Sequence, residues 1–452
     1  MTSPRVADHP LRHVPYRALL AGHTVNYLGN GIAPVALAFA VLDLGGDATD
    51  LGLVVGLYAL ADVAAVLFGG VLGDRLSRRM MMQGAAAGAA VVQGMAAASL
   101  IGGWSSLPLL AGAGMLIGAL GALGSPSSSA ITRQTVPDAL LQQAISWRRL
   151  GQNVATMLGA GLAGLVVVTA GSGWALAIDA ATFAAAAAAY SRIRVPRLPA
   201  PESTGLLADV GAGFREVLRH TWLWLLILQA LLYHLFYGGA QGVLGPIVVG
   251  ESLGRAAWGT ALSMMLAGFV VGGLVTLRWR PRRPLLVGTW FLGLTAAFPA
   301  AMAWSDSLTV VLLGAFLHGF GLEIFSVGWD LSIQQNVAPD KLARVYSFDM
   351  IGSFIARPVG LALTGPVATA VGLRSWLGVI AAVIAGSVAL SLAAPAVRRL
   401  ERLPMSSGDD TGLPSHGDHR LRPGHGDDAT PGPGHPRGPA ERSDAVHEVH
   451  GG

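Results

Sequence analysis

The stretch Gly70-Val71-Leu72-Gly73-Asp74-Arg75-Leu76-Ser77-Arg78-Arg79 is a short turn with one acid and three arginines between two long apolar segments. The second half of the chain holds a weaker copy, in which Gly272-Gly273-Leu274-Val275-Thr276-Leu277-Arg278 is followed by Arg282 and Arg283. Both copies join hydrophobic segments. A pattern that recurs at matching places in two halves indicates internal duplication, and the duplicated unit here is a set of apolar segments.

The composition is that of a membrane protein. Of the 452 residues, 52% are hydrophobic and only 12% are charged, whereas a soluble globular chain carries about 25% charged residues. The chain has no cysteine, which excludes disulfides, thiolate catalysis and cysteine-ligated metal sites. Its arginines form short clusters beside the apolar segments rather than extended basic patches, so we expect no nucleic-acid partner.

The sequence contains no pattern that predicts an enzyme. A glycine-rich phosphate loop with its lysine is absent, since Lys341 is the only lysine of the chain, and ATP hydrolysis is therefore not expected. We find no catalytic triad, no metal-ligand spacing and no cofactor motif. The segment 399–452 is rich in glycine, proline, aspartate and histidine. Such a composition cannot bury a core, so we predict a disordered tail without a specific metal site.

The apolar segments predict twelve transmembrane helices, at about 20 residues for each crossing. They lie near residues 17–42, 51–72, 80–102, 107–131, 151–170 and 174–190 in the first half, and near 222–249, 258–277, 284–304, 308–333, 347–371 and 376–397 in the second. The chain is thereby divided into a leading segment, a six-helix unit, a linker, a second six-helix unit and a tail. The boundaries of these parts are 1–16, 17–191, 192–221, 222–398 and 399–452.

The distribution of arginine predicts the orientation of these helices. Alternate loops contain basic clusters such as Arg192, Arg194 and Arg197, whereas the opposite loops hold only Arg255 and Arg374. Basic loops stay on the cytoplasmic side of a membrane, so we expect both termini and the linker on that side. Tryptophans lie at the opposite helix ends, as in an interfacial aromatic belt. They are Trp104, Trp174, Trp258, Trp304 and Trp376.

The two halves also match in detail. Thr135-Val136-Pro137-Asp138-Ala139-Leu140 corresponds to Val337-Ala338-Pro339-Asp340-Lys341-Leu342, and glycines recur at equivalent places. These are Gly159, Gly164 and Gly171 in the first half and Gly360, Gly365 and Gly372 in the second. Parallel six-helix repeats imply two bundles related by a pseudo-twofold axis along the membrane normal, with a substrate site between them near the midplane. The predicted fold class is therefore an all-α integral membrane protein built as a transporter.

Two matching polar faces are candidates for the wall of a substrate cavity. His23, Asn26 and Asn30 recur at i, i+3 and i+7 in the first predicted helix, so they share one face. The seventh predicted helix repeats the arrangement with His234, Tyr237 and Gln241. Hydrogen bonding between packed helices is the alternative role for both sets.

Ionisable residues inside predicted spans are costly in lipid and mark a pathway by default. Asp62 lies midway along the second predicted helix, and Glu323 and Asp330 share a face of the tenth. A desolvated carboxylate in a cavity can take up and release a proton, so these three acids are candidates for proton coupling. Arg357, in the eleventh helix, could neutralise Asp330 or Asp349. A fixed ion pair or a hydrogen-bonded buried acid is the alternative role.

Residues 12–400 resemble the major facilitator superfamily through the predicted twelve helices, the six-plus-six repeat and the turn from Gly70 to Arg79. Three stretches are similar to its bacterial branch of drug exporters, which also includes siderophore exporters. They are Ala33-Pro34-Val35-Ala36-Leu37-Ala38-Phe39-Ala40, Val243-Leu244-Gly245-Pro246 and Arg344-Val345-Tyr346-Ser347-Phe348-Asp349. Ser77 replaces a loop glycine of the family, and Gly159-Ala160 replaces the Gly-Pro pair that marks antiporters.

The resemblance implies roles for several of these residues. Asp74 would act as a latch that faces the N-terminus of the eleventh helix, where a carboxylate gains about 0.3–1 kcal/mol from the helix dipole. The other latch candidates are Gly70, Arg75, Arg78 and Arg79. In this family the first, fourth, seventh and tenth helices line the cavity, which favours Glu323 over Asp179 of the sixth helix. We place proton coupling on Glu323 first and on Asp62 second. The expected location is the bacterial inner membrane, crossed many times.

The predicted function is secondary active transport by alternating access. We expect a proton-coupled exporter, an antiporter, of a hydrophobic or amphipathic small molecule. Its partners would be that substrate, protons and the lipid bilayer, with no cofactor and with the monomer as the working unit. A proton-coupled importer or uniporter of a small polar metabolite is the first alternative. A membrane sensor that does not transport is the second.

Overall fold

The structure is a computed structural model, and it describes residues 9–73, 78–137, 140–194, 214–279, 281–338, 341, 342, 345, 348, 349 and 355–402. The tail beyond residue 402, most of the predicted linker, and Asp74 and Arg75 of the predicted latch lie outside the described residues. Residues 1–403 form one compact unit by their internal contacts. All that follows concerns that unit.

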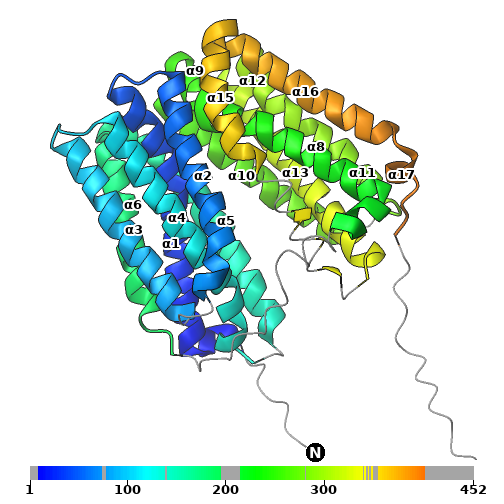
Figure 1. Ribbon diagram of the computed structural model, residues 1–452, viewed down its shortest axis with the longest axis horizontal. Helices are drawn as coiled ribbons and strands as arrows, with labels where there is room; N and C mark the ends of the chain where they lie inside the picture. Colours follow the sequence, from blue (N-terminus) through cyan, green and yellow to red (C-terminus); the bar gives the residue numbers. More distant parts are fainter. Residues whose placement is uncertain are drawn as a thin grey trace, which may run out of the picture. The chain divides into compact units, whose positions relative to one another are not determined.

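The first half of the described chain is a bundle of long helices. They are α1 (Val14–Asp43), α2 (Ala48–Gly73), α3 (Arg78–Ile101), α4 (Leu107–Thr135), α5 (Leu141–Thr169) and α6 (Ser172–Tyr190). Helix α1 packs on α5 and α6, and α4 packs on α2 and α3. Figure 1 shows these helices together, coloured blue to blue-green. An apolar chain in lipid forms helices because each peptide group must find its hydrogen bond within the segment.

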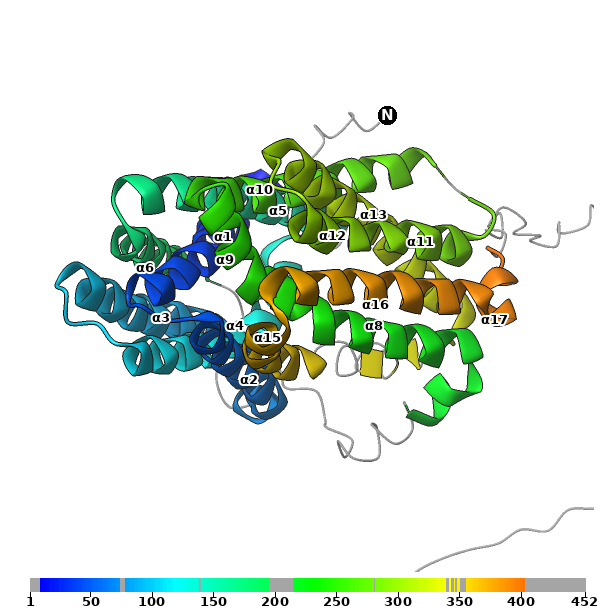
Figure 2. The same cartoon turned by 90° about the horizontal axis from the view of Figure 1, so that it is seen from above.

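The second half repeats this arrangement with two interrupted helices. Its segments are α8 (Thr221–Gly239), η3 (Ala240–Leu244), α9 (Gly245–Ser252), α10 (Arg255–Arg278), α11 (Pro284–Leu292), η4 (Gly293–Ala296), α12 (Ala297–Trp304), α13 (Leu308–Asn336), α15 (Ala356–Val371), α16 (Leu373–Ala393) and α17 (Pro395–Arg398). Figure 2 shows α8 and α16 alongside each other. The π-helical turn η3 comes just before Pro246. Proline lacks the amide that would bond to the carbonyl four residues earlier, which here is Gly242.

The predicted transmembrane helices are present. Within the described residues, ten helical segments are long and apolar enough to cross a membrane, with α8, η3 and α9 counted as one and α11, η4 and α12 as another. The apolar part of α4, Leu107–Leu123, is shorter, and α15 is described from Ala356 onward. With these two, the described helices supply ten to twelve candidates for the twelve crossings predicted from the sequence.

Glycines bring the two halves into close contact at one end of the helices, which we call the outer end. It is the end at which α1 finishes and α2 begins. A Cβ atom at Gly365 of α15 would overlap the backbone of Ala48 and Thr49 in α2. At Gly164 of α5 it would lie 3.1 Å from the Cα of Ala256 in α10. The packing role expected for small residues is therefore present at both contacts.

The pair of contacts also supports the predicted repeat. Gly164 and Gly365 were matched in the sequence, and each meets the start of an equivalent helix in the opposite half. Gly171 and Gly372, the next matched pair, both have a φ of 94° and precede α6 and α16. Only glycine adopts such a φ without strain. The same backbone geometry in both halves is what a duplicated six-helix unit requires.

The tryptophans only partly form the predicted belt. Trp104, Trp174 and Trp304 are exposed at the outer end, as an interfacial belt requires. Trp258 is instead buried, with its ring stacked on Phe298 at a centroid distance of 6.0 Å. Gly245 leaves the space that the Trp258 ring fills. The position of Trp258 in the sequence therefore predicted that it lies near the outer end, but not the direction in which its side chain points.

Candidate functional site

A cavity of about 470 Å³ lies within the first half of the protein. Its wall is built mainly from α1 to α6, and Gly242, Arg357 and Leu361 of the second half also contribute. Cavities of about 300–1,000 Å³ are the size class that holds small organic ligands. Most of the lining is apolar, with alanines and leucines of α3 and α4 on one side.

One of the two predicted polar faces lines this cavity. His23, Asn26 and Asn30 of α1 are all in its wall, as expected from their helical spacing. Asp62 of α2 lies there as well. Tyr58 is one helical turn before Asp62 and Tyr27 one turn after His23, and both also line the cavity. The sequence analysis did not single out these two tyrosines, although their i, i+4 spacing from a candidate residue was a usable signal.

Arg148 lines the cavity, although it precedes the predicted apolar span at 151–170. Helix α5 begins at Leu141, earlier than the predicted span at 151, so Arg148 is part of the helix. Tyr16 of α1 donates a hydrogen bond to the carbonyl of Ala144 at 2.7 Å and ties this turn of α5 to α1. The result places Arg148 in the cavity wall beside His23.

The contact between Arg148 and His23 determines the protonation state of the histidine ring. Arg148 Nη1 lies 3.2 Å from His23 Nε2. A guanidinium group can only donate hydrogen bonds, so His23 Nε2 must accept, and the ring is therefore neutral. Gln152 also hydrogen-bonds to this ring. The Tyr27 ring packs on it at a centroid distance of 4.5 Å.

The guanidinium group of Arg148 is not fully satisfied. Its Nε is buried and has no hydrogen-bond partner, which costs about 1–3 kcal/mol for a buried polar group. No carboxylate in the described part of the chain forms an ion pair with it, and the groups that act on its charge are Arg149 and the phenols of Tyr16, Tyr27 and Tyr190. This end of the cavity therefore carries a positive charge that no acid among the described residues neutralises.

Asp62 and Arg357 bring opposite charges from the two halves into the same cavity. Asp62 lies on α2 and Arg357 on α15, and the positive charge of Arg357 favours the Asp62 carboxylate over a neutral acid. The stem of Arg357 packs near Gly238 of α8. The sequence predicts Asp330 or Asp349 as the acid that Arg357 neutralises, and the cavity adds Asp62 as a further acid near its charge. Protonation of Asp62 would remove an attraction that acts between the halves.

Behind the cavity wall lies a fully buried acid. Asp179 of α6 is 0% exposed and accepts a hydrogen bond from Gln93 Nε2 at 2.7 Å. Gln93 itself lines the cavity. Gly29 allows α1 to lie close against α6, since a Cβ atom at Gly29 would overlap the side chains of Asp179 and Thr182. Asp179 thus orients the Gln93 amide that faces the cavity.

Glu323 and Asp330 are placed elsewhere, on α13. The Glu323 side chain is half-buried and packs over Gly272 and Gly273 of α10. Asp330 is exposed. Neither residue lines the cavity. Arg149 of α5 is the cation that acts on both carboxylates, so this second group of charges also includes residues from both halves.

The second predicted polar face lies inside the second half. Tyr237 is buried, stacks on His318 at 4.2 Å and donates to Met265 Sδ at 3.4 Å. His234 donates from Nδ1 to the carbonyl of Ala230 at 2.8 Å. Gln241 is part of the π-helical turn η3. None of these three residues lines the cavity.

The remaining predicted residues surround the turn at the opposite, inner end of α2 and α3. Gly70 lies in α2, and Arg78 and Arg79 begin α3. Asp74 and Arg75 are outside the described residues. Among the described residues, no three histidine or acidic side chains are grouped as a metal site would require.

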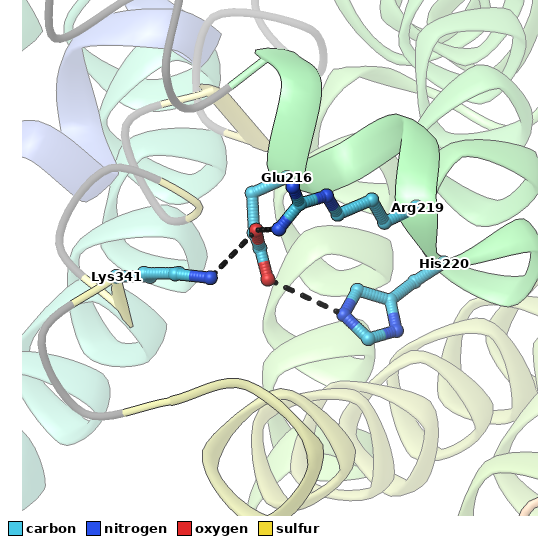
Figure 3. Close-up of polar contacts among 4 residues, drawn as sticks. All are labelled: Glu216, Arg219, His220 and Lys341. Atoms are coloured by element: carbon cyan, nitrogen blue, oxygen red, sulfur yellow. Dashed lines mark hydrogen bonds and ion pairs between the residues drawn. The ribbon is translucent and has the colours of Figure 1, made fainter.

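Ion pairs stabilise both ends of the helices. At the outer end, Arg255 of α10 lies 2.6 Å from Asp43 of α1 and covers the Phe39 ring at 5.0 Å. This pair joins the two halves. At the inner end of the second half, Glu216 bonds to Lys341 at 2.9 Å, with Arg219 and His220 beside it (Figure 3). The hydrogen bond from Lys341 lowers the pKa of Glu216 below its usual range.

Residues 19–360 match the family model of the Major Facilitator Superfamily. This chain belongs to the Major Facilitator Superfamily. It is therefore a multi-pass secondary transporter of the membrane and not an enzyme. The superfamily predicted from the turn at Gly70–Arg79 and the six-plus-six repeat is thus confirmed, and so is its all-α membrane fold.

Similar proteins within the superfamily include bacterial exporters. The chain is 28% identical to the multidrug efflux pump Tap of Mycolicibacterium fortuitum over 81% of this chain and 91% of that protein. It is 21% identical to macrolide efflux protein A of Streptococcus pyogenes over 86% of this chain and 97% of that protein. The homology to efflux pumps is distant.

Solved structures share the fold. The nucleoside transporter NupG matches with a TM-score of 0.67 at 15% identity, covering 85% of this chain and 99% of NupG. A bacterial homologue of the human lysosomal transporter Spinster matches with a TM-score of 0.68 at 17% identity, covering 85% and 96%. At these identities the likeness concerns the fold alone.

Proposed function

We propose that this superfamily member is a proton-driven exporter of hydrophobic or amphipathic small molecules. The observation that carries this proposal is the cavity, which combines a long apolar wall with tyrosine, amide and histidine side chains and one carboxylate. An apolar body would fit against α3 and α4, and the polar groups would orient it. The distant efflux-pump relatives support the direction of transport.

Asp62 is our first candidate for the proton carrier, because it lies in the cavity and interacts with Arg357 of the opposite half. A proton on Asp62 would weaken that interaction and favour separation of the two cavity walls. A ligand or proton shifts such an equilibrium only through a difference in binding free energy between the states. Glu323, with Asp330 and Arg149, is the second candidate.

Two further parts of the proposal concern the membrane. We place the protein in a bacterial inner membrane with the inner end of the helices facing the cytoplasm, as the arginine distribution predicts. We assign Asp74 and Arg75, with Arg78 and Arg79, to a latch that closes the inner end. The Asp43–Arg255 pair would hold the outer end closed in the state described here.

Transport into everted membrane vesicles tests the proposed function. We expect vesicles with an acidified lumen to accumulate an amphipathic fluorescent probe, because protons leave the lumen as the probe enters. A protonophore should abolish the accumulation, and vesicles without the protein are the control. Accumulation driven in right-side-out vesicles by outside acid would instead support the importer. Binding without movement in either preparation would support a sensor.

Cysteine labelling tests the proposed orientation. The chain has no cysteine, so single cysteines can be placed at two exposed positions, Glu251 at the outer end and Arg192 at the inner end. In intact cells, a membrane-impermeant maleimide should label Glu251→Cys and leave Arg192→Cys unlabelled until the membrane is opened. Labelling of both positions from outside would contradict the orientation.

A further inference from the structure

The charged side chains of the cavity do not balance. Of the charged residues that line it, Arg148 and Arg357 are cations and Asp62 is the one anion, so two positive charges and one negative charge leave a net charge of +1. Arg148 contributes to this surplus, since no carboxylate among the described residues forms an ion pair with it.

The Arg148 side chain lines the cavity and is held in place by a neighbour. Its Nη1 lies 3.2 Å from His23 Nε2, and this contact fixes the orientation of the guanidinium group. Its Nε is buried and has no hydrogen-bond partner. A guanidinium group binds a carboxylate through charge-assisted hydrogen bonds from its N–H groups.

The surroundings of Arg148 suit the polar end of an amphipathic molecule. Tyr27 and Tyr190 line the same cavity as Arg148, and their hydroxyl groups can donate hydrogen bonds to an anion. Beyond them the wall is apolar, with Ala85, Ala89 and Leu110 among its residues. A cationic head group would meet repulsion from Arg148 instead.

We propose that Arg148 binds the anionic group of an amphipathic substrate, such as a carboxylate, whose apolar part lies along α3 and α4. This inference rests on the proposed function and names its substrate class. Arg148 acts as the specificity residue. His23 positions it, and Tyr27 and Tyr190 complete the anion site.

Equilibrium binding of three matched amphiphiles tests the inference. The purified full chain, in nanodiscs of zwitterionic lipid, is titrated with radiolabelled decanoate, decanamide and decyltrimethylammonium, which share a similar apolar part and differ in charge. We expect decanoate to bind with an affinity at least about tenfold higher than that of decanamide, because one charge-assisted hydrogen-bonded pair contributes that much binding free energy. We expect decyltrimethylammonium to bind most weakly. Equal binding of all three, or preference for the cation, would overturn the inference.

Variants assign the preference to one residue. Arg148→Gln should lose the preference for decanoate while its affinity for decanamide stays within about twofold, and Arg148→Glu should favour the cation. Arg17→Gln is the matched control, because Arg17 is an exposed arginine of α1 that does not line the cavity. Size-exclusion profiles and thermal unfolding check that each variant is folded. If Arg148→Gln does not fold, Arg148→Lys should keep the rejection of the cation but bind decanoate more weakly. Unchanged preference in a folded Arg148 variant would overturn the inference.

Further arms separate this inference from the proposed function and from lipid binding. Proton-driven transport that selects the cation would leave the proposed function standing and refute the anion site. Decanoate selectivity through Arg148 without proton-driven transport would support the anion site and refute the proposed function. Anionic phosphatidylglycerol in the nanodiscs should leave decanoate binding unchanged. If it displaces decanoate, the site holds a lipid head group, and the proposed substrate class is wrong.

Discussion

A valine at Gly365 is expected to abolish transport by keeping the outer ends of the two halves apart. A side chain at this position would overlap the backbone of Ala48 and Thr49 in α2. Backbone atoms cannot move aside as the end of a flexible side chain can. Overpacking of this kind costs about 1–3 kcal/mol, and each 1.4 kcal/mol changes a population about tenfold. The state that is closed at the outer end would therefore be populated too little for the transport cycle to proceed.

Spin labels measure this opening directly. Labels on Asp47→Cys and Glu251→Cys report the distance between the two halves at the outer end, because both positions are exposed there and belong to different halves. Gly365→Val should lengthen this distance and stop transport. Gly386→Val in α16 is the control, since nothing lies within 4 Å of a Cβ at Gly386. Normal transport and an unchanged distance in Gly365→Val would show that the contact is not required.

The second large effect is expected from Asp62→Asn. The variant cannot bind and release a proton at this position, and it loses the interaction with Arg357. We therefore expect it to stop accumulation driven by the pH gradient while exchange of substrate down its own gradient remains measurable. An uncompensated charge in a membrane interior costs several kcal/mol. That is enough to shift the equilibrium between two conformations whose free energies differ by a few kcal/mol.

Glu323→Gln provides the comparison in the same vesicle measurement. It removes the carboxylate that packs over α10 and faces the charge of Arg149, so it should reduce coupling less than Asp62→Asn does. Glu251→Gln, at an exposed acid outside the membrane core, is the control and should transport normally. If Asp62→Asn accumulates substrate fully and Glu323→Gln does not, the proton carrier is Glu323.

Much of the fold was predictable because it depends on one-dimensional features of the chain. The thickness of the bilayer requires long apolar stretches, and those stretches are visible in the sequence. The matched glycines at 164 and 365 predicted a repeat of the two halves, and in the structure each packs against the start of an equivalent helix. The start of α5 was less clear. Arg148 precedes the apolar segment, and charge alone did not reveal that the helix already includes it.

The candidate site was predictable only in part, for a different reason. Spacing along a helix shows which residues share a face, and His23, Asn26 and Asn30 do line one cavity. It does not show which way that face is turned. Tyr237 belongs to an equivalent face, yet it stacks on His318 inside the second half.

The sequence by itself thus determined the membrane class and the repeat of the two halves, because hydrophobic length and repeated spacing are local properties of the chain. Only the tertiary structure decided which polar groups share a cavity. The rotation of each helix about its axis depends on close packing at residues such as Gly29 and Gly365. In the resulting arrangement Asp62 and Arg357, from opposite halves, line one cavity, and no carboxylate among the described residues pairs with Arg148.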